Sequence, residues 1–209
     1  MKRVAVLVSG GGTNLQALID ASTAGFIPHA QLSLVVASRA GIGAMERARL
    51  AGIPNIVVAP KDFADRDAFD EALAAVLREF GIEVVVLAGY LTILGPRVLG
   101  AFSERIINVH PSLIPSFSGD GWYGLRPHRA ALERGVKVTG ATVHLVDEVT
   151  DGGRILAQKA VEIVEGDTPE TLQQRVMQQA EWVLLPKVLE QLCDGSLSDS
   201  GGNDAHESA

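Results

Sequence analysis

The chain has 209 residues, of which 47% are hydrophobic and 5% aromatic, so it suits a single α/β domain with a mainly aliphatic core. Its formal net charge of -7 and the lack of a basic stripe argue against a nucleic-acid binder, and no apolar run is long enough to cross a membrane. The single cysteine, Cys193, excludes an intramolecular disulfide, and the N-terminus has no signal-peptide pattern, so we expect a cytoplasmic protein.

Apolar runs alternate with helical patterns along the first half of the chain. The strands expected there are 3–8, 32–37, 55–58, 83–88 and 106–109, and the helices are 14–24, 43–51 and 66–80. Such a βαβα order predicts a doubly wound α/β fold with a mostly parallel sheet.

The pattern changes after Pro111. The segments expected there are a glycine-rich loop at 116–124, a short helix at 127–133, and two strands at 139–146 and 154–164. The turn Asp151-Gly152-Gly153 separates these strands, which predicts an antiparallel C-terminal hairpin.

A long final helix is expected to start at Thr168-Pro169, an N-cap residue followed by proline at the first helical position. It should run towards Leu192 with a kink or break near Pro186. We therefore expect one domain over 1–195, and a disordered tail over 196–209 because that stretch is polar and rich in small residues.

The glycine-rich segment 9–14 lies directly between the first strand and the first helix. Glycines let backbone N–H groups approach an anion, and the helix N-terminus adds partial positive charge, so Gly12, Thr13 and Asn14 form a candidate phosphate site. A tight turn that merely needs glycine is the alternative. The P-loop lysine is absent and Leu15 replaces the third glycine of a dinucleotide fingerprint, although Arg39 leaves an NADP-dependent oxidoreductase as a rival.

Two polar residues, Asn108 and His110, share one face at the end of an aliphatic strand. In open α/β folds the sites lie at such strand ends, and polar groups there cost stability unless they are satisfied or used. Asp151 is a candidate carboxylate partner, although Asp-Gly-Gly also suits a simple turn. Close metal-ligand spacing and a G-x-S-x-G elbow are both missing, so we expect neither a metal nor a covalent nucleophile.

Five motifs carry a resemblance to a known family, at 9–18, 87–90, 108–115, 140–144 and 150–153. Together they resemble the phosphoribosylglycinamide formyltransferases, the folate-dependent family of purine synthesis within the formyltransferase superfamily. The likeness runs from Val4 to about Leu192. It implies transfer of the formyl group of 10-formyltetrahydrofolate to glycinamide ribonucleotide, with no metal and no nucleotide cofactor.

The resemblance also assigns roles to residues. His110 would be the catalytic acid, Asn108 its oxyanion-stabilising neighbour, and Asp151 the carboxylate that keeps His110 protonated. The other implied contacts are the substrate phosphate for Gly12, Thr13 and Asn14; its ribose for Glu181 and Gln178; and the folate for Arg66, Leu91, Thr92, Ile93, Leu94 and Asn108. The phosphate-binding half would be about 1–100, and the folate and catalytic half about 101–195.

The chain departs from the family pattern in its longer loop at 116–125, in Thr92 where some members have arginine, and in Trp182 where histidine is common. The resemblance implies a monomer or weak homodimer with two small-molecule substrates and no nucleic-acid or membrane partner. From the length we expect neither the extra domain of methionyl-tRNA formyltransferase nor that of formyltetrahydrofolate hydrolase. A non-catalytic sensor of a sugar phosphate remains a rival, but it would leave Asn108 and His110 unexplained.

Overall fold

The computed structural model describes residues 1–197, so nearly all of the tail expected over 196–209 lies outside the described residues. Within the described part, seven strands form one sheet in the order β3-β2-β1-β4-β5-β6-β7. The strands are β1 (Lys2–Val8), β2 (Ala30–Ala37), β3 (Asn55–Val57), β4 (Val84–Leu87), β5 (Ile106–His110), β6 (Val138–Leu145) and β7 (Ile155–Glu162). Strands β1 to β5 pair in parallel, whereas β6 and β7 pair antiparallel, which confirms the predicted fold class.

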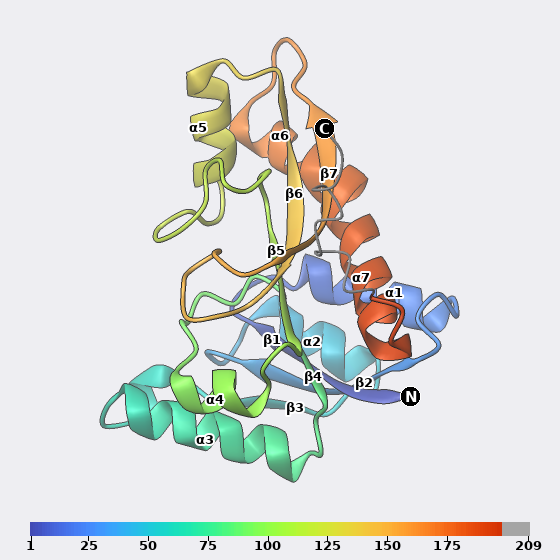
Figure 1. Ribbon diagram of the computed structural model, residues 1–209, viewed down its shortest axis with the longest axis vertical. Coiled ribbons are helices and arrows are strands. Elements are labelled where there is room, and N and C mark those ends of the chain that lie inside the picture. Colours follow the sequence, from blue (N-terminus) through green and yellow to red (C-terminus); the bar gives the residue numbers. More distant parts are fainter. Residues whose placement is uncertain (198–209) are drawn as a thin grey trace, which may run out of the picture.

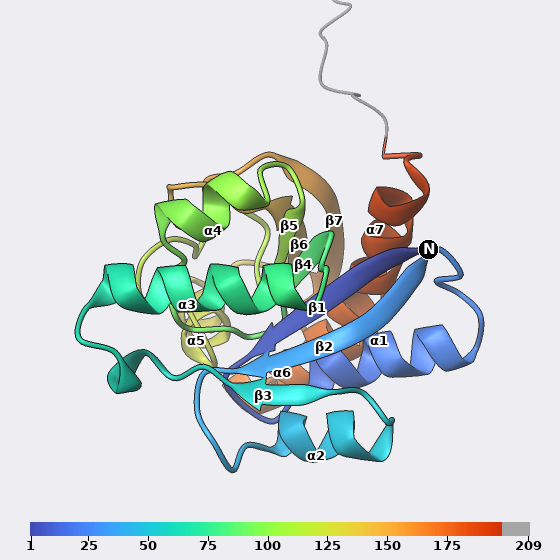
Figure 2. The same cartoon turned by 90° about the horizontal axis from the view of Figure 1, so that it is seen from below.

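Helices cover both faces of the sheet, because successive residues of a strand point to opposite sides. The helices are α1 (Thr13–Thr23), α2 (Gly43–Leu50), α3 (Arg66–Glu79), α4 (Pro96–Ala101), α5 (Arg126–Arg134), α6 (Pro169–Val176) and α7 (Trp182–Asp194). On β1, Val4, Val6 and Val8 pack with α1, α2 and α7, whereas Ala5 and Leu7 pack with α3 and α4. Figure 2 shows α3 and α4 on one side of β1 and β2, and α1 and α2 on the other.

The final helix differs from the sequence prediction. The expected irregularity near Pro186 occurs earlier, as a π-helical turn at Met177–Glu181 that joins α6 to α7. Pro186 itself lies buried inside α7. Pro186 removes the hydrogen bond to the carbonyl of Trp182, which lies inside α7, whereas the π turn ends at Glu181.

The topology gathers the ends of three neighbouring strands at one edge of the sheet. The carboxyl ends of β1, β4 and β5 lead into the glycine-rich loop, the 91–94 segment and His110, respectively. Antiparallel β6 then places His144 opposite Asn108, and the β6–β7 connection carries Asp151. Figure 1 shows β5 and β6 in the centre of the molecule, with α5 to one side and α7 to the other. Among residues 1–197, no helix combines the length and apolar character needed to span a bilayer.

Candidate active site

A cavity of about 390 Å³ opens at this edge of the sheet. Its walls come from the glycine-rich loop, the segment after β4, the end of β5, the loop before α5, the β6–β7 connection and the helix turn around Met177. It therefore joins the two groups of residues that the sequence singled out, the end of the glycine-rich loop and the Asn108–His110 pair.

His110 is buried, and both of its ring nitrogens face oxygen atoms. Nδ1 lies 3.3 Å from Oδ2 of Asp151, and Nε2 lies 2.9 Å from the carbonyl oxygen of Phe117. Because a carbonyl oxygen only accepts, Nε2 carries a proton and donates it to Phe117. Burial lowers the pKa of His110 below its ordinary value, although Asp151 and the Phe117 carbonyl act in the opposite direction. Asp151 thus raises the pKa of His110 by less than burial lowers it, and its role in keeping His110 protonated stays a prediction.

Asp151 serves as a turn residue and as a carboxylate partner at once. Its backbone is left-handed, with φ of 56°, and the next residue, Gly152, would clash with Val149 at 2.6 Å if it had a Cβ. Its Oδ2 accepts from the N–H of Gly119 at 2.9 Å while facing His110. Burial alone would raise the pKa of Asp151, but the charge of His110 and the N–H of Gly119 are among the contacts that bring it below its ordinary value.

A second histidine orients Asn108. His144 is buried, and its Nδ1 donates to the carbonyl oxygen of Leu145 at 2.7 Å. Its Nε2 therefore presents a lone pair, which lies 3.1 Å from Nδ2 of Asn108. This contact fixes the rotation of the Asn108 amide at the mouth of the cavity.

The glycine-rich loop presents Thr13 and Asn14 to the same cavity. Gly12, the N-cap of α1, has φ of 77°, and a Cβ there would lie 2.7 Å from Ala44. Only glycine fits this turn, which supports the tight-turn interpretation, and the anion site stays a prediction. Among residues 1–197, the Thr13 hydroxyl has only a weak sulfur partner, Met177 at 3.7 Å, which leaves it available to a ligand.

Glu181 forms the deepest polar contact of this wall. It is buried and accepts from Nδ2 of Asn14 at 2.7 Å, whereas Oδ1 of Asn14 is buried and has no partner in the described part of the chain. Burial raises the pKa of Glu181 to about 7, partly countered by Asn14. A ligand hydroxyl that donates to either oxygen would satisfy this pair.

The 91–94 segment is held at both ends. The Leu91 N–H donates to Oγ of Ser9 at 3.0 Å, and the N–H groups of Gly95 and Arg97 donate to the buried Asp70. All four residues, Leu91, Thr92, Ile93 and Leu94, line the cavity. The fixed backbone suits a flat ligand that needs hydrogen bonds from main-chain groups.

Two residues that the resemblance suggested are not brought to the cavity. Arg66 is exposed at the start of α3, and Gln178 is exposed on the π-helical turn. Gln173 and Met177 line the wall instead, because the π turn changes which residues of this segment face inward. Gly12 does not line the cavity itself but immediately precedes Thr13, which does.

Several wall residues were not assigned from the sequence. They include Tyr90, His144, Gln173 and Met177. His144 lies in a motif that had been noticed, but its role depends on the strand register that places it opposite Asn108.

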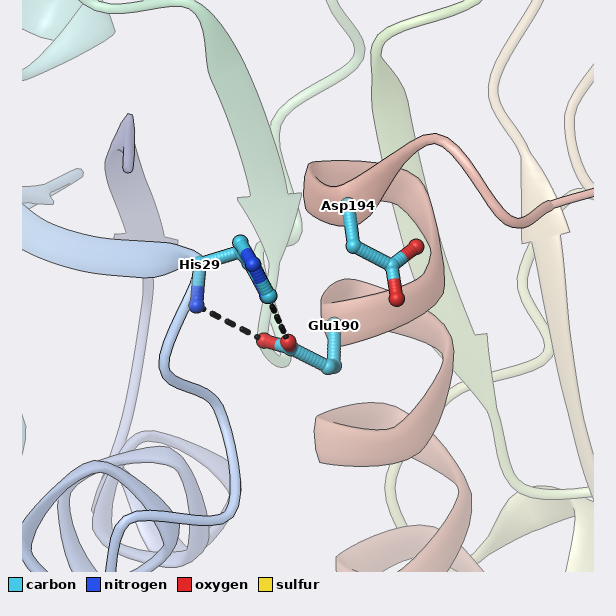
Figure 3. Close-up of side chains that lie close together, drawn as sticks. All are labelled: His29, Glu190 and Asp194. Carbon is cyan, nitrogen blue, oxygen red and sulfur yellow. Dashed lines mark hydrogen bonds and ion pairs between the residues drawn. The ribbon is translucent and has the colours of Figure 1, made fainter.

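A different cluster lies at the opposite end of the sheet, where β2 begins. His29, Glu190 and Asp194 each bring one potential metal-ligand atom within 4.8 Å of the others, and they are the single such group among the described residues. None of the three lines the cavity of the candidate active site. Figure 3 shows that Glu190 is already engaged by both the backbone N–H and the ring of His29. We interpret this cluster as a structural contact that connects α7 to the start of β2.

Comparison with known proteins places the chain in a family. The sequence profile described as "Formyl transferase" matches residues 2–189. The chain belongs to the formyl transferase family. Among solved structures, this formyltransferase is 42% identical to glycinamide ribonucleotide transformylase 1 from Symbiobacterium toebii, with a TM-score of 0.87 and coverage of 93% of this chain and 89% of that one. Phosphoribosylglycinamide formyltransferase from Bacillus halodurans is 40% identical, with a TM-score of 0.85 and coverage of 93% and 97%.

Curated relatives agree with this group. The chloroplastic phosphoribosylglycinamide formyltransferase of Arabidopsis thaliana is 41% identical over 197 residues, which are 92% of this chain and 66% of the relative. The trifunctional purine biosynthetic protein adenosine-3 of Homo sapiens is 43% identical over 195 residues, but the formyltransferase spans only 19% of its length. The chain is therefore an enzyme, a formyltransferase of the type found in purine biosynthesis.

Proposed function

We propose that the protein transfers the formyl group of 10-formyltetrahydrofolate to the amine of glycinamide ribonucleotide in de novo purine (IMP) biosynthesis. The observation that supports this most directly is that the anion-binding loop and the Asn108–His110–Asp151 group open into one cavity. A phosphorylated amine held at Thr13 and Asn14 would reach His110 without leaving that cavity.

The two walls suggest how the substrates divide the space. The phosphate would lie at Thr13 and Asn14 at the start of α1, with a ribose hydroxyl at Glu181. The folate would lie along the fixed 91–94 backbone and the β6–β7 connection. Its formyl carbon would then face Asn108 and His110.

The substrate amine is itself the nucleophile, so the protein need not supply one. Its nitrogen attacks the formyl carbon and gives a tetrahedral intermediate with a negative oxygen and a positive nitrogen. An amide donor such as Asn108 stabilises that oxygen, an effect worth roughly 10²–10³ in rate. The intermediate collapses when the bond from carbon to folate N10 breaks, and N10 then takes a proton.

His110 would manage that proton. The attacking nitrogen must lose one proton and N10 must gain one, so a histidine between them transfers it without net change, for roughly 10²–10⁴ in rate. Burial lowers the pKa of His110, and Asp151 offsets part of that effect by stabilising the imidazolium. These steps need neither a metal nor a nucleotide cofactor.

We further propose that the enzyme is cytoplasmic and consists of one domain over 1–195, with a phosphate-binding half of about 1–100 and a folate and catalytic half of about 101–195. It would act on its two small substrates as a monomer or weak homodimer, without nucleic acid or membrane.

The test is an assay with 10-formyltetrahydrofolate and glycinamide ribonucleotide as the sole additions. We expect tetrahydrofolate and the formylated amine to appear in equal amounts, without ATP or NADPH and unaffected by chelator. Absence of transfer together with tight NADPH binding that needs Arg39 would replace this proposal with an oxidoreductase.

A further inference from the structure

Two loops meet over His110 and Asp151. The loop 116–124 and the β6–β7 connection project to the same side of strands β5 and β6 (Figure 1). Two consecutive residues of one loop bond to two consecutive residues of the other. The Gly119 N–H donates to Oδ2 of Asp151 at 2.9 Å, and the Thr150 hydroxyl donates to Oδ1 of Asp120 at 2.7 Å. We call this pair of hydrogen bonds the clasp.

The clasp holds the carbonyl of Phe117 against the catalytic histidine. Phe117 has a left-handed backbone, with φ of 52°, and its ring packs edge-on against Trp122 at a centroid distance of 5.8 Å. Its carbonyl oxygen accepts the Nε2 proton of His110 at 2.9 Å. Since Asp151 faces Nδ1, this closed arrangement leaves no ring nitrogen of His110 free.

A histidine engaged in this way cannot assist water. In the absence of an amine, the formyl donor is exposed to hydrolysis: the water oxygen attacks the formyl carbon, the bond from carbon to N10 breaks, and N10 takes a proton, giving formate and tetrahydrofolate. That reaction needs the same proton handling as transfer. A bound amine substrate can displace the Phe117 carbonyl, whereas a passing water molecule brings no further binding contacts to do so.

We propose that Asp120 and Thr150 are positioning residues that hold the Phe117 carbonyl on His110 until the amine substrate is bound, and so direct the formyl group to the amine rather than to water. The inference rests on the proposed function, because it concerns the fate of the same donor. Both side chains are exposed and lie at the rim of the cavity, so they act through Gly119 and Phe117 and not by touching the reacting atoms.

The chain offers matched variants. Thr150→Val and Asp120→Ala each remove the hydrogen bond between the Thr150 hydroxyl and the Asp120 carboxylate. Thr150→Ser keeps the hydroxyl donor, and Asp120→Asn keeps an oxygen acceptor. Ser118→Ala is the control within the same loop, because the Ser118 hydroxyl donates to the Pro115 carbonyl and takes no part in the clasp.

The experiment measures formate release from 10-formyltetrahydrofolate alone and formyl transfer with glycinamide ribonucleotide present. We expect the ratio of hydrolysis to transfer to rise about fivefold in Thr150→Val and Asp120→Ala, a change of the size that one ordinary hydrogen bond allows. The conservative variants and Ser118→Ala should keep the wild-type ratio. The double variant Asp120→Ala with Thr150→Val should resemble each single variant, because the two residues share one bond.

An unchanged ratio in both disruptive variants, or an equal rise in Ser118→Ala, would overturn the inference. Thermal denaturation of each variant shows whether it is folded. If Thr150→Val is unstable, the ratio measured for Asp120→Ala, a substitution at an exposed residue, tests the inference. A wild-type enzyme that transfers no formyl group would overturn the proposed function instead, and the two failures are therefore distinct.

Discussion

Asn108 and His144 face each other across the antiparallel pair of β5 and β6, with 3.1 Å between Nδ2 of the amide and Nε2 of the ring. The Leu145 carbonyl fixes the ring so that Nε2 accepts. The Asn108 amide is thus oriented by a residue on the neighbouring strand.

His144→Phe should therefore lower kcat by about tenfold, the effect of losing one buried hydrogen bond that orients Asn108, and leave KM for both substrates nearly unchanged. His144→Gln should recover much of the rate, because its side-chain oxygen can accept from the same amide. Steady-state kinetics on both variants check this. A rise in KM with unchanged kcat would mean that His144 supports substrate binding and does not orient Asn108.

The second prediction concerns the anion-binding loop. Gly12→Val places a side chain against Ala44 at a left-handed position, so binding of the phosphorylated substrate should weaken while folate binding is kept. Gly25→Val is the matched control, since Gly25 has φ of +75° and open space around it. Calorimetric titration of each variant with each ligand is the measurement. Equal loss of both ligands in Gly12→Val would argue against a phosphate site there.

The third prediction concerns Glu181 and stability. Burial raises its pKa from 4.5 to about 7, so the folded state disfavours the ionised form. The stability of the protonated form is fully present below pH 4.5 and is lost as pH rises through about 7. The full cost is on the order of 3 kcal/mol. Glu181→Gln should flatten the dependence of Tm on pH across that window, and an unchanged slope would show that Glu181 is ionised at little cost.

The fourth prediction concerns the pair of His110 and Asp151. In Asp151→Asn the carboxylate no longer raises the pKa of His110, so the residual activity should fall off at lower pH than in the wild type. The losses caused by the His110 and Asp151 substitutions should be less than additive, since Asp151 acts through His110. The pH profile of kcat/KM measures both. A profile that keeps its wild-type alkaline limb would show that Asp151 does not set the protonation of His110.

Local sequence patterns predicted much of the fold and part of the site. Periodicity placed the five parallel strands and the hairpin, since the aliphatic runs are long and bounded by turn residues. Helix α4 was missed because it is short. The π-helical turn was missed because the predicted break was placed at Pro186, which lies inside α7.

The site residues that the sequence indicated were those with local signals. Asn108 and His110 share a strand face, and Thr13 and Asn14 follow glycines. His144 depended on strand register, and the clasp depended on how two loops pack. Neither is encoded in the spacing of residues along the chain.

In the proposed mechanism, His110 carries out the proton transfers of formyl transfer. The most direct measurement compares wild type and His110→Ala in single-turnover formyl transfer, with binding of each substrate measured on the same samples. We predict that His110→Ala loses most of kcat, roughly 10²–10⁴, while both substrates bind nearly as in the wild type, since the histidine acts mainly in the transition state. Transfer at close to the wild-type rate in His110→Ala would contradict this assignment.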